Sequence, residues 1–390
     1  MNDKLMIFGI YLTKLLGDMA NERKSVLVDE EDFDWTEFYK FANFHNVANM
    51  LYYQLKDFDL ADDIIKVFAD SSKKAVSRCA RFEFMSDRIC NKLENANVEY
   101  ALLKGKTLQK LYPFEYMRIS TDVDILLQKQ SRNDVENIML AENFEKVSSS
   151  DDEDVYHKNP IYSFEIHFDV TKKESYFYDY FNNFFTRSKK CDSNSCREFK
   201  SEDQYIYNLY HLYTHYSNGG CGVRMFLDMY LLDKKLDLDY DYIENELAKI
   251  DLIDFNVFVR NMCRVLFDGA ECEENEKILL RYIFTSGTFG TWQVGIIANI
   301  QNQGDGKKFF LKKSSFVLKS WFLGIDAMKA FYPVLNKFPF LLPFCWIHKG
   351  VYTLLFKRSA IKKQIDESKS FSTKKSDILD NIKKMSGVRH

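Results

Sequence analysis

Apolar residues recur at helical spacing along the first hundred residues. Between Trp35 and Leu55 they fall mostly three or four positions apart, which predicts an amphipathic helix. The stretch from Ile64 to Leu93 predicts a longer helix that leads into the first strand. Residues 1–97 are therefore expected to form an N-terminal helical region. His45 has no neighbouring ligand residues, so we interpret it as a packing or surface histidine.

The pattern becomes mixed helix and strand after residue 97. Apolar and alternating runs predict strands at 98–103, 119–127 and 144–147, and a hairpin of 155–158 and 163–170 across Asn159-Pro160. Helices are predicted between these strands at 106–111 and 132–142. These elements define an α/β core at 98–172, followed by a helical domain at 173–305.

The chain changes character again near residue 306. Twelve Lys or Arg residues and one acid lie between Lys307 and Lys363, interleaved with aromatic residues. We interpret residues 306–367 as a basic, aromatic helical region whose charges face water. The alternative is that segment 307–363 docks an acidic protein, a polyanionic polymer or an anionic membrane surface. Residues 368–390 are polar and are predicted to form a flexible tail with one short helix near 376–385.

Composition narrows the class of protein. The 390 residues exceed the size of one typical core, and the chain has 34 Phe and 23 Tyr but only five Pro, which favours long helices and an aromatic interior. A net charge of -3 gives no overall attraction to nucleic acid or anionic lipid. The eight cysteines contain no C-x-x-C pair, which argues against a zinc site.

Targeting signals are not apparent in the sequence. Residues 1–20 are a charged amphipathic segment, which reads as neither a signal peptide nor a membrane anchor. The longest apolar run, Phe338 to Ile347, holds two prolines and is about half a membrane span, which excludes a spanning helix there. Together with unpaired cysteines, these features predict a cytoplasmic protein.

The stretch from Ala101 to Leu127 combines features that phosphate chemistry requires. An apolar run ends in Lys104-Gly105-Lys106 just before a helical segment, so that backbone N–H groups and two ammonium groups face an anion there. Arg118 follows. Asp122 and Asp124 then lead into a buried type of strand with both carboxylates on one face.

A second strand supplies candidates for a third ligand. In 163–170, apolar residues alternate with Glu165, His167 and Asp169, so the three polar side chains share one face. Glu165 is our choice for the third acid. His167 is the substitute, as an acceptor base or hydrogen-bond partner, and Asp169 comes third because it lies farther along the strand.

An Asp-x-Asp pair carries little information by itself, since the same spacing occurs in this chain at positions such as Asp57/Asp59. Asp122 and Asp124 differ because they open a buried strand beside a cationic loop. The alternative for this pair is a solvated edge strand with protective charges. We expect the strands of Asp122, Asp124 and Glu165 to be neighbours in the sheet.

The chemistry that fits this set is nucleotidyl or phosphoryl transfer with two metal ions. Asp122 and Asp124 would each contact Mg²⁺ (or Mn²⁺), and Glu165 would hold the second ion near the acceptor oxygen. The charge of the triphosphate would be neutralised by the remaining members of the set, namely Lys104, Lys106, Arg118 and the Gly105 amide.

Two further pairs lie on predicted helices. His211 and His215 are spaced i, i+4, as are Arg224 and Asp228. No third metal ligand is marked, so we interpret both pairs as helix-packing or helix-surface contacts. Asp228 is surrounded by apolar residues and needs a partner if it is buried, while a role in a pocket wall is the alternative.

These residues resemble the nucleotidyltransferase superfamily of DNA polymerase beta, and more closely a bacterial group labelled uncharacterised nucleotidyltransferases. The resemblance rests on LLKG at 102–105, LYP at 111–113, Arg118, DVDILL at 122–127 and EIH at 165–167, with YHLYTH at 210–215 and RMFLDMYLL at 224–232 downstream. It implies an α+β fold, mostly helical around a small mixed sheet, with two Asp on one strand and the third acid on its neighbour. Lys104-Gly105-Lys106 replaces the superfamily's usual glycine-serine pair.

The resemblance implies transfer of a nucleoside monophosphate from a nucleoside triphosphate (NTP) to an unknown acceptor, with a small molecule favoured. Two alternatives remain at this level. One is a catalytically degenerate binding module, which would be expected to have lost an acid. The other is an enzyme that nucleotidylates a protein or tRNA, for which the basic segment argues and the net charge argues against.

Overall fold

The computed structural model describes residues 4–27, 33–159, 162–191, 195–274, 276–287, 328, 332–336, 338–348 and 381–389. Its helices are α1 (Lys4–Ala20), α2 (Trp35–Phe44), α3 (Ala48–Leu55), α4 (Asp62–Asn95), α5 (Gly105–Gln109), α6 (Arg132–Ala141), α7 (Tyr178–Phe181), α8 (Ser201–Gly219), α9 (Val223–Lys235), α10 (Tyr240–Ala248), α11 (Ile253–Phe267) and α12 (Glu276–Ser286). Its strands are β1 (Tyr100–Leu102), β2 (Val123–Leu127), β3 (Glu145–Ser149), β4 (Glu153–Lys158), β5 (Tyr162–His167), β6 (Lys189–Lys190) and β7 (Cys196–Glu198). Short 3₁₀ turns include η1 (Glu115–Met117), just before β2.

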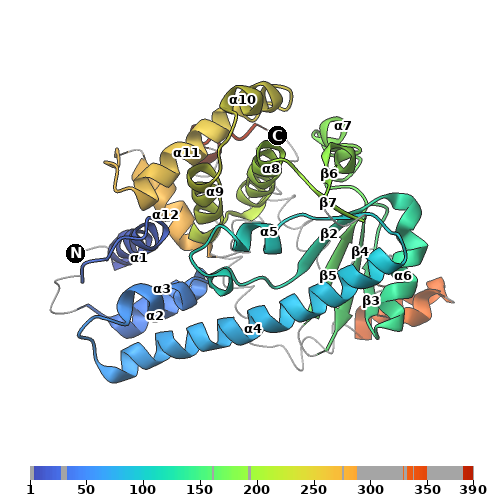
Figure 1. The fold of residues 1–390 in the computed structure, drawn as a ribbon, viewed down its shortest axis with the longest axis horizontal. Coiled ribbons are helices and arrows are strands. Elements are labelled where there is room, and N and C mark those ends of the chain that lie inside the picture. Colours follow the sequence, from blue (N-terminus) through green and yellow to red (C-terminus); the bar gives the residue numbers. More distant parts are fainter. Residues whose placement is uncertain are drawn as a thin grey trace.

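The strands form one mixed sheet in the order β3-β4-β5-β2-β1-β7-β6. β2 runs parallel to β5 and β1 runs parallel to β7, while the other neighbours are antiparallel. In Figure 1 the sheet lies beside a group of helices, and the long α4 runs along both parts. The prediction of an α+β fold, mostly helical around a mixed sheet, is confirmed.

The two faces of the sheet pack against different cores. Ile125, Leu127 and Phe164 belong to a cluster that includes residues of α4 and α6. Ala101 and Leu126 belong instead to a larger cluster built mainly from α1, α3 and α8 to α12. Because side chains alternate along a strand, the even-numbered residues of β2 face the larger cluster. This face also carries the acidic residues described below.

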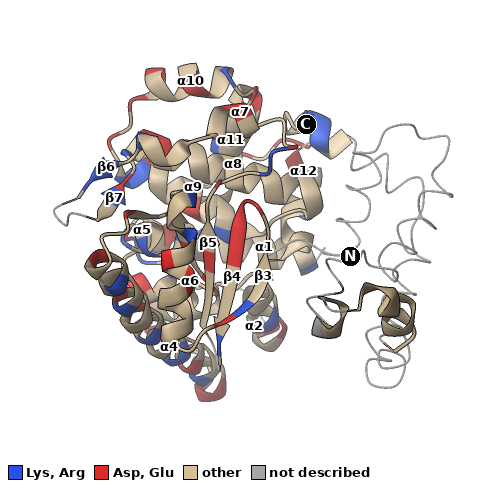
Figure 2. Ribbon diagram, turned by 90° about the vertical axis from the view of Figure 1, so that its right-hand side faces the viewer, with Lys and Arg blue, Asp and Glu red and all other residues tan. Residues whose placement is uncertain are grey.

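Helix α4 connects the two cores. Phe68 in its first half packs in the larger cluster, and Leu93 in its last turn packs under the sheet. Charges of both signs follow its outer surface along its whole length (Figure 2). The prediction of one long helix leading to the first strand is confirmed, with bounds slightly wider than expected.

Two predictions of helix were wrong in detail. The single helix expected over 35–55 is divided into α2 and α3, because Asn46 adopts a left-handed φ of 56° that ends the first helix. The region 173–305 was expected to be helical but contributes β6 and β7, the latter pairing with β1. These strands are two and three residues long and polar, so they leave no alternation in the sequence.

Much of the predicted basic region 306–367, with its segment 307–363, and residues 368–380 of the tail lie outside the described residues. Residues 381–385 are helical, in line with the short helix predicted near 376–385. Ile382 is buried in the larger cluster and Arg389 lies 3.4 Å from Asp251, so this end of the chain packs on the helices and differs from the flexible tail expected there. Within the described ranges, no helix combines the length and apolar character needed to cross a membrane.

His45 lies at the break between α2 and α3 and is completely buried. Its Nε2 is 3.1 Å from the carbonyl oxygen of Phe284, which joins this break to α12. Burial lowers the pKa of His45 from 6.5 to about 4, a shift that the carbonyl contact opposes only in part. The neutral ring is therefore part of the packed structure, as the interpretation of a packing histidine requires.

This burial predicts a specific loss of stability in acid. The unfolded chain binds a proton at His45 more readily than the folded protein, so the stabilisation is complete above pH 6.5 and is lost as the pH falls towards 4. Between pH 7 and pH 5, the free energy of unfolding of the wild type should fall by about 2 kcal/mol more than that of His45→Gln. Urea unfolding at a series of pH values measures this difference, and parallel pH profiles of the two proteins would contradict it.

Candidate active site

The predicted aspartates lie where β2 begins. Asp122 directly precedes the strand and Asp124 is its second residue, so both are on the face that turns towards the larger helical cluster. Asp124 is buried, and in the parallel pairing of β2 with β5 it is the register partner of Glu165. The expectation that the two strands are neighbours is confirmed.

Asp124, Glu165 and His167 form one close cluster. His167 Nε2 lies 3.2 Å from Asp124 Oδ1 and 3.7 Å from Glu165 Oε2. One potential ligand atom from each of the three residues lies within 4.8 Å of the others, and in the described part of the chain this is the one such group of three. Asp122 is adjacent in sequence but is not a member of this closest group, and Asp169 is not either.

Lys104 is the cationic partner of this cluster. Its Nζ lies 2.8 Å from Asp124 Oδ1, and its side chain is only 15 % exposed. Burial alone would raise the pKa of Asp124, but the charges and hydrogen bonds of Lys104 and His167 outweigh burial and hold that pKa well below its usual range. Asp124 is therefore firmly ionised, and Lys104, predicted as a phosphate contact, forms an ion pair with it.

The pKa values of the other two acids, Glu165 and Asp122, are raised instead. Burial, followed by the charges of Asp124 and Asp122, raises the pKa of Glu165 to about 7. Burial and the charge of Asp124 also raise the pKa of Asp122, against the opposing effect of Lys104. Three carboxyl groups thus share a space with more negative charge than Lys104 offsets, and a divalent cation would relieve this repulsion.

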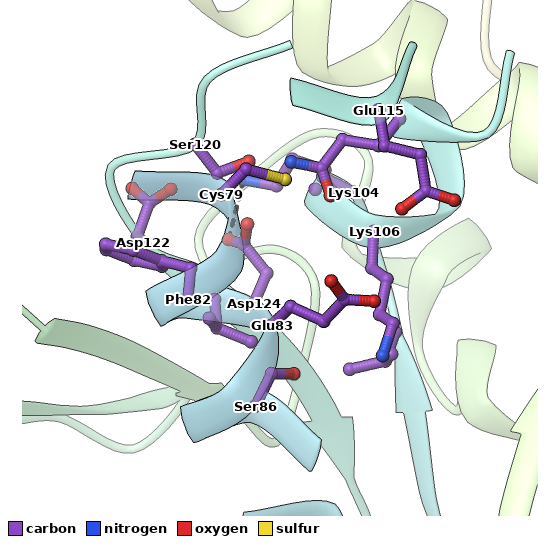
Figure 3. Close-up of a pocket in the computed structure, with 14 residues that line it drawn as sticks. Cys79, Phe82, Glu83, Ser86, Lys104, Lys106, Glu115, Ser120, Asp122 and Asp124 are labelled. Carbon is purple, nitrogen blue, oxygen red and sulfur yellow. Dashed lines mark ion pairs between the residues drawn. The ribbon is translucent and has the colours of Figure 1, made fainter. Parts of the chain in front are cut away.

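A small hollow of about 40 Å³ opens beside the two aspartates (Figure 3). Its walls are formed by α4, the start of α5 and the segment before β2, and its polar residues include Glu83, Lys104, Lys106, Ser120 and Asp122. It has acids as well as cations, which makes it less cationic than the sequence suggested.

Two further predicted phosphate contacts, Lys106 and Gly105, line the hollow. Lys106 lines the hollow but forms an ion pair with Asp87 of α4. Gly105 begins α5 close to the segment before β2, and a Cβ at this position would lie 3.2 Å from Ser120 Oγ. The absence of a side chain therefore lets α5 approach this segment.

Arg118 does not line this hollow. Its Nε donates to Asp228 Oδ1 at 2.8 Å and its Nη2 donates to Asp228 Oδ2 at 3.0 Å, and Tyr112 donates to the same carboxylate at 2.8 Å. The three side chains are buried. This fork of hydrogen bonds supplies the partner that a buried Asp228 was expected to need, and it occupies the guanidinium that was predicted to contact the triphosphate.

The segment that leads to Asp122 is held by side-chain hydrogen bonds from four helices. Side-chain donors bind four successive carbonyl oxygens: Asn49 to Met117 at 2.8 Å, Gln109 to Arg118 at 2.8 Å, Arg224 to Ile119 at 2.7 Å and Arg78 to Ser120 at 3.0 Å. The donors come from α3, α5, α9 and α4 respectively. The position of the aspartates therefore depends on helices far apart in the sequence. These donors could not be predicted from local sequence patterns.

Glu153 is a further neighbour that the sequence did not indicate. Its Oε2 lies 3.4 Å from His167 Nδ1, and the two residues are register partners in the antiparallel pairing of β4 with β5. Its carboxylate orients the imidazole whose other nitrogen reaches Asp124. The predicted strands ended at 147 and resumed at 155, but Ser148 and Ser149 belong to β3 and Glu153 and Asp154 belong to β4.

A family model described as uncharacterised nucleotidyltransferase matches residues 31–268. The chain belongs to this family. The match spans well over half of the chain and contains the two aspartates, Glu165, His167 and Lys104. No curated protein and no solved structure matches the chain.

The ion pair of Arg118 with Asp228 yields a test of its structural role in this nucleotidyltransferase family member. Asp228→Asn leaves the Arg118 guanidinium buried without a compensating charge, so the free energy of unfolding should fall by about 3 to 5 kcal/mol. Denaturant unfolding measures this change. The control is Glu37→Gln, which removes the exposed pair of Glu37 with Lys40 and should cost below about 1 kcal/mol. Equal effects of the two substitutions would contradict the buried pair.

Proposed function

We propose that this chain transfers a nucleoside monophosphate from an NTP to a hydroxyl or phosphate group of a small-molecule acceptor. The observation that supports this most strongly is the register of Asp124 with Glu165 on neighbouring parallel strands, with Lys104 2.8 Å from Asp124. Membership of the nucleotidyltransferase family supports the same class of reaction.

The residues present suit a divalent metal. Asp122, Asp124 and Glu165 are the proposed ligands, and carboxylate oxygens are the ligands that Mg²⁺ prefers. His167 adds an imidazole nitrogen within the same cluster, which Mn²⁺ accepts more readily than Mg²⁺. A bound divalent cation would neutralise charge on the triphosphate and lower the pKa of the acceptor hydroxyl.

The surrounding residues have roles that follow from their positions. Lys104 lies at the boundary between the cluster and the hollow, so its ammonium group is placed to contact a phosphate as well as Asp124. The amide of Gly105 and the side chain of Lys106 stand at the same end of the hollow. His167 lies between Asp124 and Glu153, and its Nε2–H donates to the ionised Asp124, so its role here is that of a hydrogen-bond partner that orients this carboxylate.

The proposal predicts that both aspartates are required for binding and transfer. Isothermal titration of the wild type with magnesium and each NTP in turn should show binding of at least one NTP, which identifies the base. In the Asp122→Asn, Asp124→Asn double variant, metal-dependent binding should be lost, and transfer to acceptors in a metabolite extract, followed with the labelled NTP, should fall by about two orders of magnitude or more.

A matched control lies elsewhere in the same chain. Asp57 and Asp59 have the same spacing but are exposed in the turn before α4. The Asp57→Asn, Asp59→Asn variant removes the same charge and should bind and transfer as the wild type does. Absence of NTP binding to the wild type, or equal behaviour of the two double variants, would overturn the proposal.

A further inference from the structure

A second, small hollow of about 40 Å³ lies between α8 and α9. Its polar lining consists of Arg118, Asn208, His211, His215, Arg224 and Asp228, and its apolar lining comes from leucine and methionine side chains. The two hollows share no lining residue, but the segment from Arg118 to Asp124 contributes to both: Arg118 lines the second, while Ser120, Asp122 and Asp124 line the first.

Arg224 is the second cation that lines this hollow. The charge of Arg118 is already balanced by Asp228, whereas Arg224 forms no ion pair with any carboxylate in the described ranges. Its Nη1 donates to the carbonyl oxygen of Ile119 at 2.7 Å, but its Nε is buried and has no hydrogen-bond partner among the described residues. Burial and the nearby charge of Arg118 lower the pKa of Arg224, and the charges of Asp228 and Asp122 offset this only in part. In a partly buried guanidinium, a buried N–H without an acceptor is costly, and a bound anion would supply that acceptor.

Two imidazoles face the same space. The rings of His211 and His215 meet edge to face along α8 with centroids 4.5 Å apart, and Tyr207 stacks on His211 one turn earlier. Within the described part of the chain, neither histidine ring forms a hydrogen bond or an ion pair with another residue. Burial lowers the pKa of His211 far below 6.5 and that of His215 to about 4, so both rings are neutral at pH 7 and each offers one N–H donor.

The second hollow is joined by a hydrogen bond to the segment that carries the aspartates. Arg224, which lines the hollow, donates to the carbonyl oxygen of Ile119, three residues before Asp122. The aspartates lie on the sheet face that turns towards the cluster containing α8 and α9. A group bound in this hollow would therefore contact a residue that also holds the segment leading to Asp122.

We propose that a phosphate group of the substrate binds in the hollow between α8 and α9, with the Arg224 guanidinium as its ionic partner and His211 and His215 as hydrogen-bond donors. A tetrahedral phosphate has enough acceptor oxygens to satisfy all three side chains. The assignment of this phosphate to a substrate rests on the proposed function. Its two possible sources are the triphosphate of the NTP and a phosphate ester on the acceptor.

The test is a titration of the full-length protein with inorganic phosphate in magnesium-free buffer, followed by phosphorus NMR. The wild type should bind phosphate saturably, and Arg224→Gln should weaken the affinity by about tenfold or more. Arg224→Lys keeps the charge but loses the planar fork and should be intermediate. The control is Arg264→Gln, which removes an exposed arginine of α11 and should leave the affinity unchanged.

Because Arg224 also holds the Ile119 carbonyl, its loss can disturb the fold, so thermal melting accompanies each titration. His215→Gln is the second variant, and it should weaken phosphate binding several-fold without affecting the Arg224 contact to Ile119. No phosphate binding by the wild type, or wild-type affinity in the folded His215→Gln and Arg224→Gln proteins, would overturn the proposal. If Arg224→Gln does not fold, the His215→Gln result decides.

Titration with magnesium-ATP and with phenyl phosphate then identifies the source. Weakened binding of magnesium-ATP to Arg224→Gln assigns the phosphate to the NTP, while loss confined to phenyl phosphate assigns it to the acceptor. Phosphate binding without metal requires neither Asp122 nor any transfer step. Failure of this phosphate site is therefore distinguishable from failure of the proposed nucleotidyl transfer.

Discussion

The arrangement of the candidate site depends on four hydrogen bonds to successive carbonyl oxygens, from Met117 to Ser120. Regular helices and strands satisfy their carbonyls with their own backbone, but this segment relies on side chains from four different helices. Each bond is worth only about 1 kcal/mol of net stability. Together they define where the chain enters β2, and hence where Asp122 and Asp124 stand relative to β5.

Electrostatics then distinguishes the acids that this scaffold brings together. Asp124 is held ionised by Lys104 and His167, whereas burial and like charge raise the pKa of Asp122 and Glu165. One strong cation contact is therefore shared among three carboxyl groups. Carboxyl groups that repel one another in this way are costly to the fold, and a divalent cation would relieve the repulsion, which is the balance expected of a functional site.

The sequence was most informative where candidate ligand residues also follow the two-residue spacing of a β-strand. The run at 122–127 combines two acids at strand spacing with a buried apolar stretch, and the alternation at 163–170 placed Glu165 and His167 on one polar face. Both predictions depend on nearest neighbours along a strand, and both strands are present as neighbours in the sheet. The long α4 was equally clear because its apolar period persists over many turns.

Features that depend on contacts between residues far apart in the sequence could not be predicted in this way. The role of Glu153 follows from the register of β4 with β5, and the partner of Arg118 lies 110 positions away at Asp228. The break at Asn46 depends on one left-handed residue, and β7 is a strand only because β1 is available to pair with it. Tertiary contacts decide each of these features, so the sequence alone gave Arg118 a different neighbour and one helix in place of two.

The central claim is that Asp122, Asp124 and Glu165 form one divalent metal site beside Lys104. Anomalous diffraction from crystals soaked with Mn²⁺ and a non-hydrolysable NTP analogue tests it most directly. The account predicts manganese peaks within coordination distance of Asp124 and Glu165, with the triphosphate on the side of Lys104. Manganese density elsewhere on the protein, with these carboxylates still bound only to Lys104 and His167, would contradict it.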